Sequence, residues 1–240
     1  MFRKKAAKLK KNTIRWRSHE PTRLETFSDA VFAFAVTLVI VSLEVPKTFD
    51  ELFETMKGFM SFGCCFGILF LIWNSQNIFF RRFGLTDAWI TTLNGFLLFL
   101  VLTYTYPLKF LFTLVFSGNV TVNHGQSMAM ISDAQVPTLM YVYDLGYILI
   151  YLLFYLMYRH AHRHAEKLEL TPFEVFETQS QMYLNVINVM IGILGIVITV
   201  VLPQGLKGAS GYTYMLIPFA YWIFFSTRAT RSKKLFVTAG

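Results

Sequence analysis

An arginine, a serine and an aspartate stand where the first long apolar segment of this chain begins. Arg23 precedes the segment, Ser28 and Asp29 lie just inside it, and mainly apolar residues continue to Val45. A charge inside lipid costs several kcal/mol unless it is paired. Polar residues at such a position therefore serve either ion movement or a buried polar contact between helices.

The composition predicts an all-α protein that crosses a membrane several times. Of the 240 residues, 55% are hydrophobic and 25 are Phe, more than one water-soluble core of this size can bury, and the mean hydropathy is +0.48. Adjacent cysteines bridge poorly, so we expect Cys64 and Cys65 to be reduced packing residues. The basic first residues lack the pattern of a cleaved leader, so we expect the first apolar segment to direct insertion.

Six segments are long and apolar enough to cross a bilayer as helices, which takes about 20 residues each. They are residues 24–45, 58–80, 88–108, 137–158, 181–203 and 211–227. Thr22 and Glu25 fit a capping box at the start of the first, and Pro46 ends it. The predicted organisation is a basic N-terminal tail (1–22), a six-helix transmembrane domain (23–227) and a basic C-terminal tail (228–240).

The distribution of basic residues predicts the orientation of these helices. With Arg23 counted in the N-terminal tail, all but four of the 22 Lys and Arg fall in the two tails and in the second–third and fourth–fifth connections; the exceptions are Lys47, Lys57, Lys109 and Lys207. By the positive-inside rule, both termini are then cytoplasmic in a multi-pass protein of the plasma membrane. We interpret the net charge of +8 mainly as a signal that sets the membrane topology, and we expect the basic N-terminal tail to contact lipid head groups. We expect no nucleic-acid partner.

Polar side chains on three predicted helices fall at a similar depth near the cytoplasmic side. Asp29, for example, lies about 9 Å into the first helix. Buried amides and carboxylates in lipid find partners on neighbouring helices, at about 0.6–2 kcal/mol per hydrogen bond. We therefore expect one buried network with an arginine as the charge partner. Its expected members are Arg23, Ser28, Asp29, Trp73, either Asn74 or Asn77, and Asn94.

Rotation about the first helix separates Asp29 from an apolar stripe. At about 100° per residue, Asp29 lies roughly 140° from Phe34. The stripe around Phe34 contains Phe27, Ala30, Leu38, Val41 and Val45, with Thr37 at its margin. We interpret Asp29 as part of a structural clamp, with a proton or ion site as the alternative. The stripe alone indicates no more than packing, because this helix is apolar on all sides.

The first helix resembles that of the TMEM175-type potassium channel family. The motif is Arg-x-x-x-Phe-Ser-Asp at residues 23–29, within RLETFSDAVFAFAVTLVIVSLEVP. Trp73 on the second helix, Leu93-Asn94 on the third and Tyr106-Pro107 further on are also similar to the family pattern. The likeness is strong over residues 20–110 and concerns only topology afterwards.

The resemblance implies a homotetramer in which four first helices line a potassium-permeable pore. It implies no enzymatic activity and no cofactor; K+ is the permeant ion. The family lacks the carbonyl-lined filter of ordinary potassium channels and uses a constriction of apolar and hydroxyl side chains. Carried over by position, this constriction falls on Phe34, Thr37, Leu38 and Val41.

Two positions depart from the family pattern. Phe34 stands where a smaller aliphatic residue is usual, so we expect four phenyl rings either to plug the pore or to form a dewetted gate. Gln76 and Asn77 stand where a histidine usually follows the tryptophan of the second helix, which makes pH sensing through the clamp doubtful.

Three weaker patterns have ordinary explanations. His160 and His164 share a helical face and can bind a metal, but a basic helix end explains them equally well, and we predict no metal site. Asp144 either attracts cations or, as we expect, bonds a nearby tyrosine. The fourth helix carries a stripe that is typical of helix packing, formed by Tyr143, Tyr147, Tyr151, Tyr155 and Tyr158.

Two functions compete with a passive channel. The first is a secondary transporter that uses Asp29 as its coupling site. The second is a non-conducting membrane scaffold, in which the Phe34 side chains block the passage of ions. Transporters often show internal repeats and helices broken by Gly or Pro at mid-membrane. No repeat is evident, and Pro46 and Pro107 are predicted at helix ends. The sequence therefore favours a passive, potassium-selecting channel with a hydrophobic constriction.

Overall fold

The computed structural model describes residues 14–18, 20–41, 48–119, 121–123 and 126–236, and every structural statement below refers to these. Six α-helices, one 3-10 helix and two short strands follow one another along the described chain. They are α1 (Arg23–Val41), α2 (Phe49–Phe83), α3 (Ala88–Ser117), β1 (Thr121–Asn123), β2 (Gln126–Met128), α4 (Val136–Arg163), α5 (Pro172–Val201), η1 (Gln204–Met215) and α6 (Leu216–Phe236).

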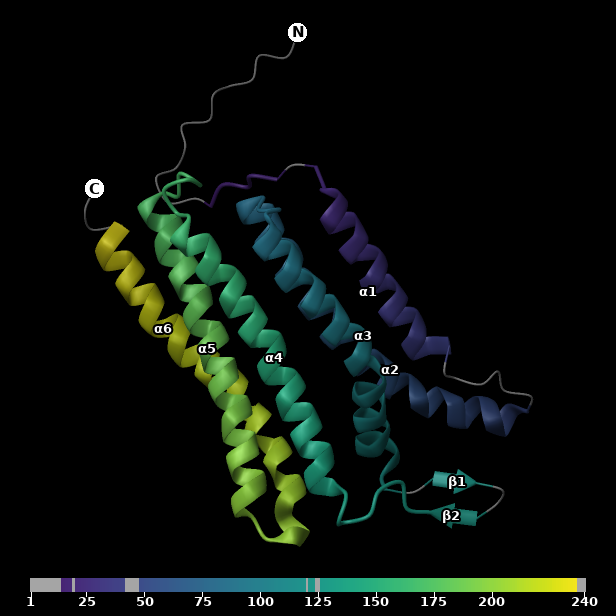
Figure 1. The fold of residues 1–240 in the computed structure, drawn as a ribbon. Helices are drawn as coiled ribbons and strands as arrows, with labels where there is room; N and C mark the ends of the chain where they lie inside the picture. Colours follow the sequence, from purple (N-terminus) through teal and green to yellow (C-terminus); the bar gives the residue numbers. More distant parts are fainter. Residues whose placement is uncertain (1–13, 19, 42–47, 120, 124–125, 237–240) are drawn as a thin grey trace.

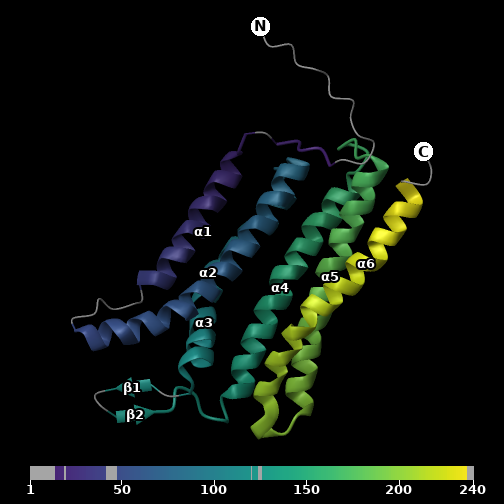
Figure 2. The same ribbon diagram turned by 180° about the vertical axis from the view of Figure 1, so that it is seen from behind.

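The helices form two packed groups that lie side by side (Figures 1 and 2). α1 packs on α2 and α3, whereas α4 and α5 pack together with η1, and α6 lies against α5. Contacts between α3 and α4 join the groups. α1 begins and α2, α4 and α6 finish at one end of the molecule, which we call the basic end because it carries Arg81, Arg82 and Arg163.

The start of α5, at the basic end, is fixed by a capping box. Thr171 is the N-cap, and its hydroxyl accepts a hydrogen bond from the backbone N–H of Glu174, while the Glu174 carboxylate accepts from the backbone N–H of Thr171. Pro172 occupies the first helical position, where its missing N–H costs nothing. This complete capping box fixes the position of Glu174 at the basic end.

Two apolar cores hold the elements together. The larger core joins the two groups through aromatic side chains, and the ring of Phe79 on α2 meets that of Tyr158 on α4 edge to face at 5.2 Å between centroids. The second core lies beneath α1 and includes Phe32, Ala35 and Val39. Cys65 is buried in this second core and unbridged, as expected from its sequence context.

Four described helical segments are long and apolar enough to cross a membrane. They are Gly58–Phe83, Ala88–Phe116, Val136–Arg163 and Pro172–Val201. The prediction of a polytopic helical membrane protein is thereby confirmed in its coarse form. α1 carries Arg23, Glu25 and Asp29 near its start, α6 ends in basic residues, and neither is among the four; six spans remain a prediction.

A short hairpin departs from the expected all-helical architecture. β1 and β2 pair antiparallel between α3 and α4, with Thr121 opposite Met128. Each strand has only three residues, too few for the alternation of apolar and polar residues by which a strand is recognised in a sequence. The last predicted span is also displaced, because η1 occupies residues 204–215 and α6 starts only at Leu216.

The expectation that Pro107 ends its helix is wrong. Pro107 lies inside α3, which continues to Ser117. Pro107 has no N–H to donate to the carbonyl of Thr103, four residues earlier, but membrane helices tolerate prolines in their interior. Here the hydroxyl of Tyr143 on α4 donates to the carbonyl oxygen of Pro107 at 2.6 Å, so a neighbouring helix braces the chain at this point. Pro46 lies outside the described residues.

Candidate functional site

The start of α1 is fixed by its cap. The backbone N–H of Glu25 donates to the hydroxyl of Thr22 at 3.3 Å, as the capping pattern predicts. From there, side chains at helical spacing turn toward α2 and α3, and they are Ser28, Phe32, Ala35 and Val39, all buried. One face of α1 is therefore occupied by packing within the protomer.

The opposite face of α1 carries the predicted pore residues. Phe34 is 56% exposed, Thr37 is exposed and Leu38 is half-buried, while the side chain of Val41 lies outside what the structure describes. Phe27, on the same stripe, is 61% exposed. The sequence-predicted stripe is thus uncovered in the single protomer. The hydroxyl of Thr37 donates to the backbone carbonyl of Ala33 at 2.9 Å, which fixes its rotamer.

Three buried amide and hydroxyl groups join α1, α2 and α3. The Asn94 amide donates to the Ser28 hydroxyl at 2.9 Å, and the Gln76 amide donates to the Asn94 side-chain oxygen. Ser28 in turn donates to the backbone carbonyl of Leu24 at 2.8 Å. All three side chains are at most 2% exposed, and we call Ser28, Gln76 and Asn94 the polar lock.

Asp29 and Trp73 form a second, separate contact between α1 and α2. The indole N–H of Trp73 donates to Asp29 Oδ1 at 2.7 Å. Asp29 is exposed in the protomer, unlike the polar lock. The expected single network is therefore divided in two, with Ser28 and Asn94 in one part and Asp29 and Trp73 in the other.

Three of the predicted network residues stand apart from these contacts. Among the described residues, Arg23 forms no ion pair, so its expected charge partner is not found there. Neither Asn74 nor Asn77 donates or accepts a described hydrogen bond within the polar lock. Gln76 takes the place that we had expected for one of them. Its spacing of seven from Leu69 and from Phe83, both buried, is the signal that marks it as inward-facing.

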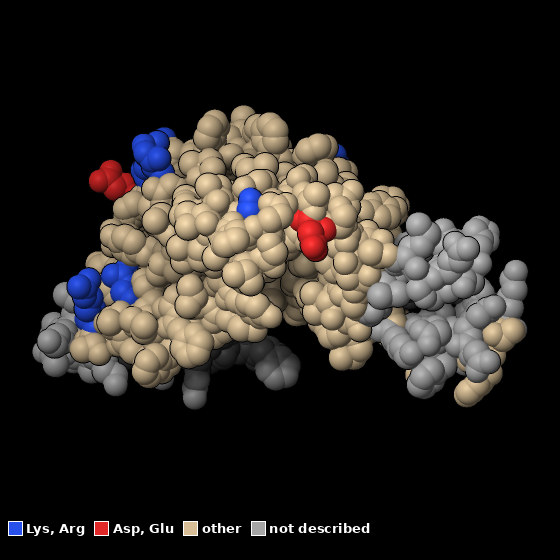
Figure 3. All heavy atoms as spheres, turned by 90° about the horizontal axis from the view of Figure 1, so that it is seen from below, with Lys and Arg blue, Asp and Glu red and all other residues tan. Residues whose placement is uncertain are grey.

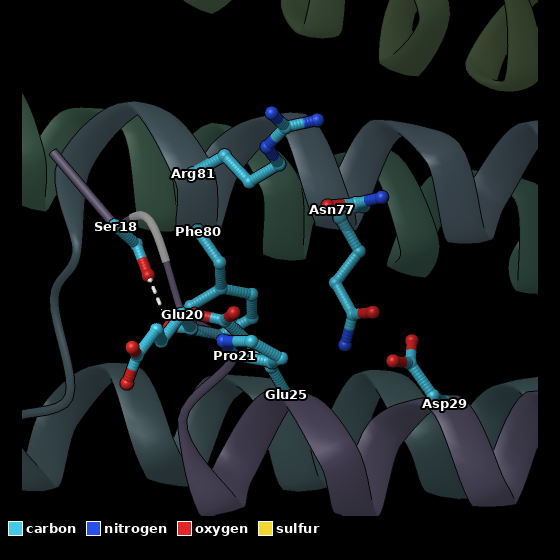
Figure 4. A pocket seen from close by; sticks show the side chains of 9 residues that line it. Ser18, Glu20, Pro21, Glu25, Asp29, Asn77, Phe80 and Arg81 are labelled. Atoms are coloured by element: carbon cyan, nitrogen blue, oxygen red, sulfur yellow. Dashed lines mark hydrogen bonds between the residues drawn. The ribbon is translucent and has the colours of Figure 1, made fainter. Parts of the chain in front are cut away.

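A cavity of about 260 Å³ opens beside Asp29 at the basic end, between α1, α2 and the segment before α1 (Figure 4). Asp29 and Glu25 line it from α1, and Asn77 and Arg81 line it from α2, with the guanidinium of Arg81 turned away from Asp29 (Figure 4). Glu25 Oε1 is buried without a partner among the described residues. The cavity can hold water or a small cation, but no cluster of described His, Cys, Asp or Glu has the form of a metal site.

Two of the three weaker sequence patterns receive structural explanations. His160 Nε2 lies 3.1 Å from Asp87 Oδ2, and its ring lies 4.3 Å from that of His164, so both histidines belong to contacts at the end of α4. The hydroxyl of Tyr214 donates to Asp144 Oδ1 at 2.6 Å, which confirms the expected bond between this acid and a tyrosine.

These features define a polytopic helical membrane protein whose first helix is locked on one side and uncovered on the other. The model of the family described as "Endosomal/lysosomal potassium channel TMEM175" matches residues 23–107. A protein named "Potassium channel" from Marivirga tractuosa is 34% identical over 228 residues, 92% of each chain. The chain belongs to the TMEM175 family.

Two further comparisons agree with this assignment. A potassium channel from Chamaesiphon minutus is 29% identical over 96 residues, which cover 37% of this chain and 47% of that protein. A crystal structure of a variant of the potassium channel MtTMEM175 superposes with a TM-score of 0.77 at 33% identity, covering 91% of this chain and 97% of that one. The similarity extends well past residue 110, further than the motifs alone indicated.

Proposed function

We propose that this chain forms a passive, potassium-favouring cation channel in which four copies of α1 line a central pore. The observation that carries the proposal is the two-sided environment of α1. Its buried face is tied to α2 and α3 by the polar lock, while the stripe with Phe34 and Thr37 is uncovered. Relatives over nearly the whole chain carry the name of potassium channels.

In a homotetramer, the uncovered stripe of each protomer would face the same stripe of the other three. In a closed ring, the same face of each protomer meets a common axis. A phenyl ring from each of four copies of Phe34 then narrows the passage, and such an apolar constriction gates ions by excluding water. Leu38 and Val41 continue the constriction at helical spacing.

Thr37 supplies the polar part of the constriction. Its hydroxyl hydrogen is committed to the carbonyl of Ala33, so the lone pairs of the oxygen are turned outward from the helix backbone. Four such oxygens can replace part of the hydration shell of a K+ ion. The ion moves down its gradient, and no covalent step, enzymatic cofactor or resident metal takes part.

The proposal places six transmembrane helices in the plasma membrane with both termini in the cytoplasm. α1 crosses with its charged residues near one surface, and α6 ends in basic residues at the same surface. The basic end, where α1 begins and α6 ends, then faces the cytoplasm. The opposite end is supported as the outer one because the described part of its surface is largely uncharged, with only a few Lys, Arg, Asp and Glu (Figure 3).

The polar lock and the Asp29–Trp73 bond serve this pore as a structural clamp. They hold the start of α1 against α2 and α3, so that the lining side chains keep their rotation toward the axis. A coupled transporter is the second candidate, because Asp29 borders the cavity at the basic end. In that case Asp29 would bind a proton or ion during each cycle.

Potassium flux into liposomes tests the proposed function. Purified tetramers should conduct K+ down a gradient, with a rate that rises linearly with the number of tetramers and needs no counter-ion gradient. Empty vesicles and vesicles with heat-denatured protein are the controls. Intact tetramers that conduct no K+ would refute the channel, and saturable flux strictly coupled to protons would favour the transporter.

A further inference from the structure

A short segment before α1 lies across the basic end of the molecule. Ile14–Ser18, which we call the strap, passes over the last turn of α2 and reaches the loop between α4 and α5. The backbone N–H of Arg17 donates to the carbonyl of Arg81 at 2.9 Å. The guanidinium of Arg81 lies 4.6 Å from the ring centre of Trp16, so the side chains pack there as well.

The strap ends on a buried carboxylate. Glu174, in the first turn of α5, is 1% exposed and accepts from both strap arginines. The guanidinium of Arg17 bonds both carboxylate oxygens, at 3.2 Å and 3.0 Å, in the bidentate geometry that makes such pairs strong. Arg15 adds its backbone N–H at 2.9 Å and its guanidinium at 3.4 Å. A carboxylate this deeply buried is retained only with such partners.

The same arginines hold the loop that precedes α5. Arg17 Nε donates to the carbonyl of Leu168 at 3.1 Å, and both arginines donate to the carbonyl of Glu169. Glu169 has a φ of 48°, in the left-handed region that non-glycine residues seldom adopt. The loop, the strap and Glu174 therefore form one interdependent cluster.

The strap continues directly into the helix proposed to line the pore. Ser18 donates to the carbonyl of Glu20, and α1 begins at Arg23. α1 itself packs on α2 and α3, whereas the strap carries its start toward α5 on the far side of the protomer (Figure 1). A pull on α1 through the strap is thus directed away from the uncovered stripe.

We propose that Glu174 is a positioning residue for the pore helix: it anchors the strap, and the anchored strap keeps the start of α1 away from the axis of the pore. The effect on ion flux rests on the proposed function, whereas the anchoring itself does not. Release of the strap lets the four starts of α1 approach one another, which narrows the cytoplasmic entrance without changing the side chains that select the ion.

Glu174→Gln tests the anchor, because it removes the charge and keeps the shape. In detergent-solubilised tetramers, trypsin should cut after Arg17 about tenfold faster than in the wild type, measured from the released peptide by mass spectrometry. In liposomes, K+ flux per tetramer should fall by about threefold or more with an unchanged K+/Na+ permeability ratio. Glu174→Asp, which retains the charge, should keep most of the protection and most of the flux.

Glu177→Gln is the matched control, since Glu177 lies one turn further along α5 and makes no described bond to the strap. It should behave as the wild type in both assays. Equal cleavage of Glu174→Gln and Glu177→Gln would overturn the anchor, and faster cleavage with unchanged flux would overturn its link to the pore. A wild-type protein without K+ flux would instead refute the proposed function, and the cleavage assay would still decide the anchor.

Arg15→Gln provides a second test of the anchor if the Glu174→Gln protein does not assemble. The Arg15 side chain is 36% exposed, so its loss leaves the fold intact and removes one of the two guanidinium contacts. Cleavage after Arg17 should then accelerate by about threefold, because the Arg17 pair remains. No acceleration would overturn the proposal.

Discussion

The two helical groups bury their polar residues in different ways. In the second group, α4, α5 and α6 are joined by aromatic hydroxyls: Tyr147 donates to Asn188 at 2.6 Å, and Asn188 donates to Tyr221 at 2.7 Å. In the first group, the side chains of the polar lock are also buried, yet one stripe of α1 and the carboxylate of Asp29 remain exposed. The second group is thus joined by bonds between side chains of its own helices, whereas the first keeps Asp29 and one stripe of α1 at the surface of the protomer.

Burial of the apolar stretches is highest in α5. There 39% of residues are buried within the protomer, against 22% in α4 and 17% in α2 and α3. A helix that exposes apolar surface in a membrane protein faces lipid, another subunit or a passage. α5 is therefore the most enclosed of these four helices, and under the proposed function the uncovered stripe of α1 is the surface used for assembly and conduction.

The largest effect is expected from Asn94→Leu, which removes the middle of the polar lock. Gln76 then loses its acceptor and Ser28 its donor inside an apolar environment, at a cost of about 2–4 kcal/mol. Tetramers should dissociate or unfold at a clearly lower temperature, followed by size-exclusion chromatography after heating. Ser75→Ala, an exposed change that affects only a bond within α2, is the control. Equal heat resistance of the two variants would show that the lock does not hold α1.

Thr37→Val should have a smaller and more selective effect. Valine has the shape of threonine without the hydroxyl, so assembly is kept while the proposed ring of oxygens is lost. The K+/Na+ permeability ratio should fall by about fivefold, equivalent to about 1 kcal/mol, measured from reversal potentials. Thr92→Val on α3 removes an exposed hydroxyl bonded in the same way to its own helix and should leave the ratio unchanged. An unaltered K+/Na+ permeability ratio in Thr37→Val would show that Thr37 does not select the ion.

The smallest effect is expected from Asp29→Asn. Asparagine keeps an oxygen acceptor for the indole of Trp73 and loses only the charge, so stability should fall by no more than about 1 kcal/mol. Ion preference should not change in Asp29→Asn. Asp29→Ala should weaken assembly of the tetramer and also leave ion preference unchanged. Stable Asp29→Ala tetramers with a changed ion preference would contradict the clamp and favour a coupling role for Asp29.

The sequence predicts the first group better than the second because its signals are local. The Arg-x-x-x-Phe-Ser-Asp motif and the spacing of Phe34, Thr37 and Leu38 lie on one helix, where rotation can be counted. Asn94 and Ser28 were recognised as polar residues at one depth, but the choice of Gln76 over Asn74 or Asn77 depends on how α2 is rotated against α3.

Other features depend on contacts between distant parts of the chain. The pairing of Arg15 and Arg17 with Glu174 spans more than 150 residues, and no local pattern indicates it. The capping box of Thr171 and Glu174 could have been found from its spacing, and it would have placed the start of α5 earlier. A proline near the end of an apolar run does not by itself show whether the helix ends there, and the bond from Tyr143 to the Pro107 carbonyl comes from another helix.

Modification of a cysteine at position 37 tests the central claim most directly. In a background with Cys64 and Cys65 replaced by serine or alanine, Thr37→Cys channels are exposed to a membrane-impermeant thiol reagent while K+ flux is recorded. The account predicts rapid and nearly complete block, and no block of Phe99→Cys, whose parent side chain is 63% exposed on α3 and does not belong to the proposed pore helix. Full flux through modified Thr37→Cys tetramers would contradict a pore lined by α1.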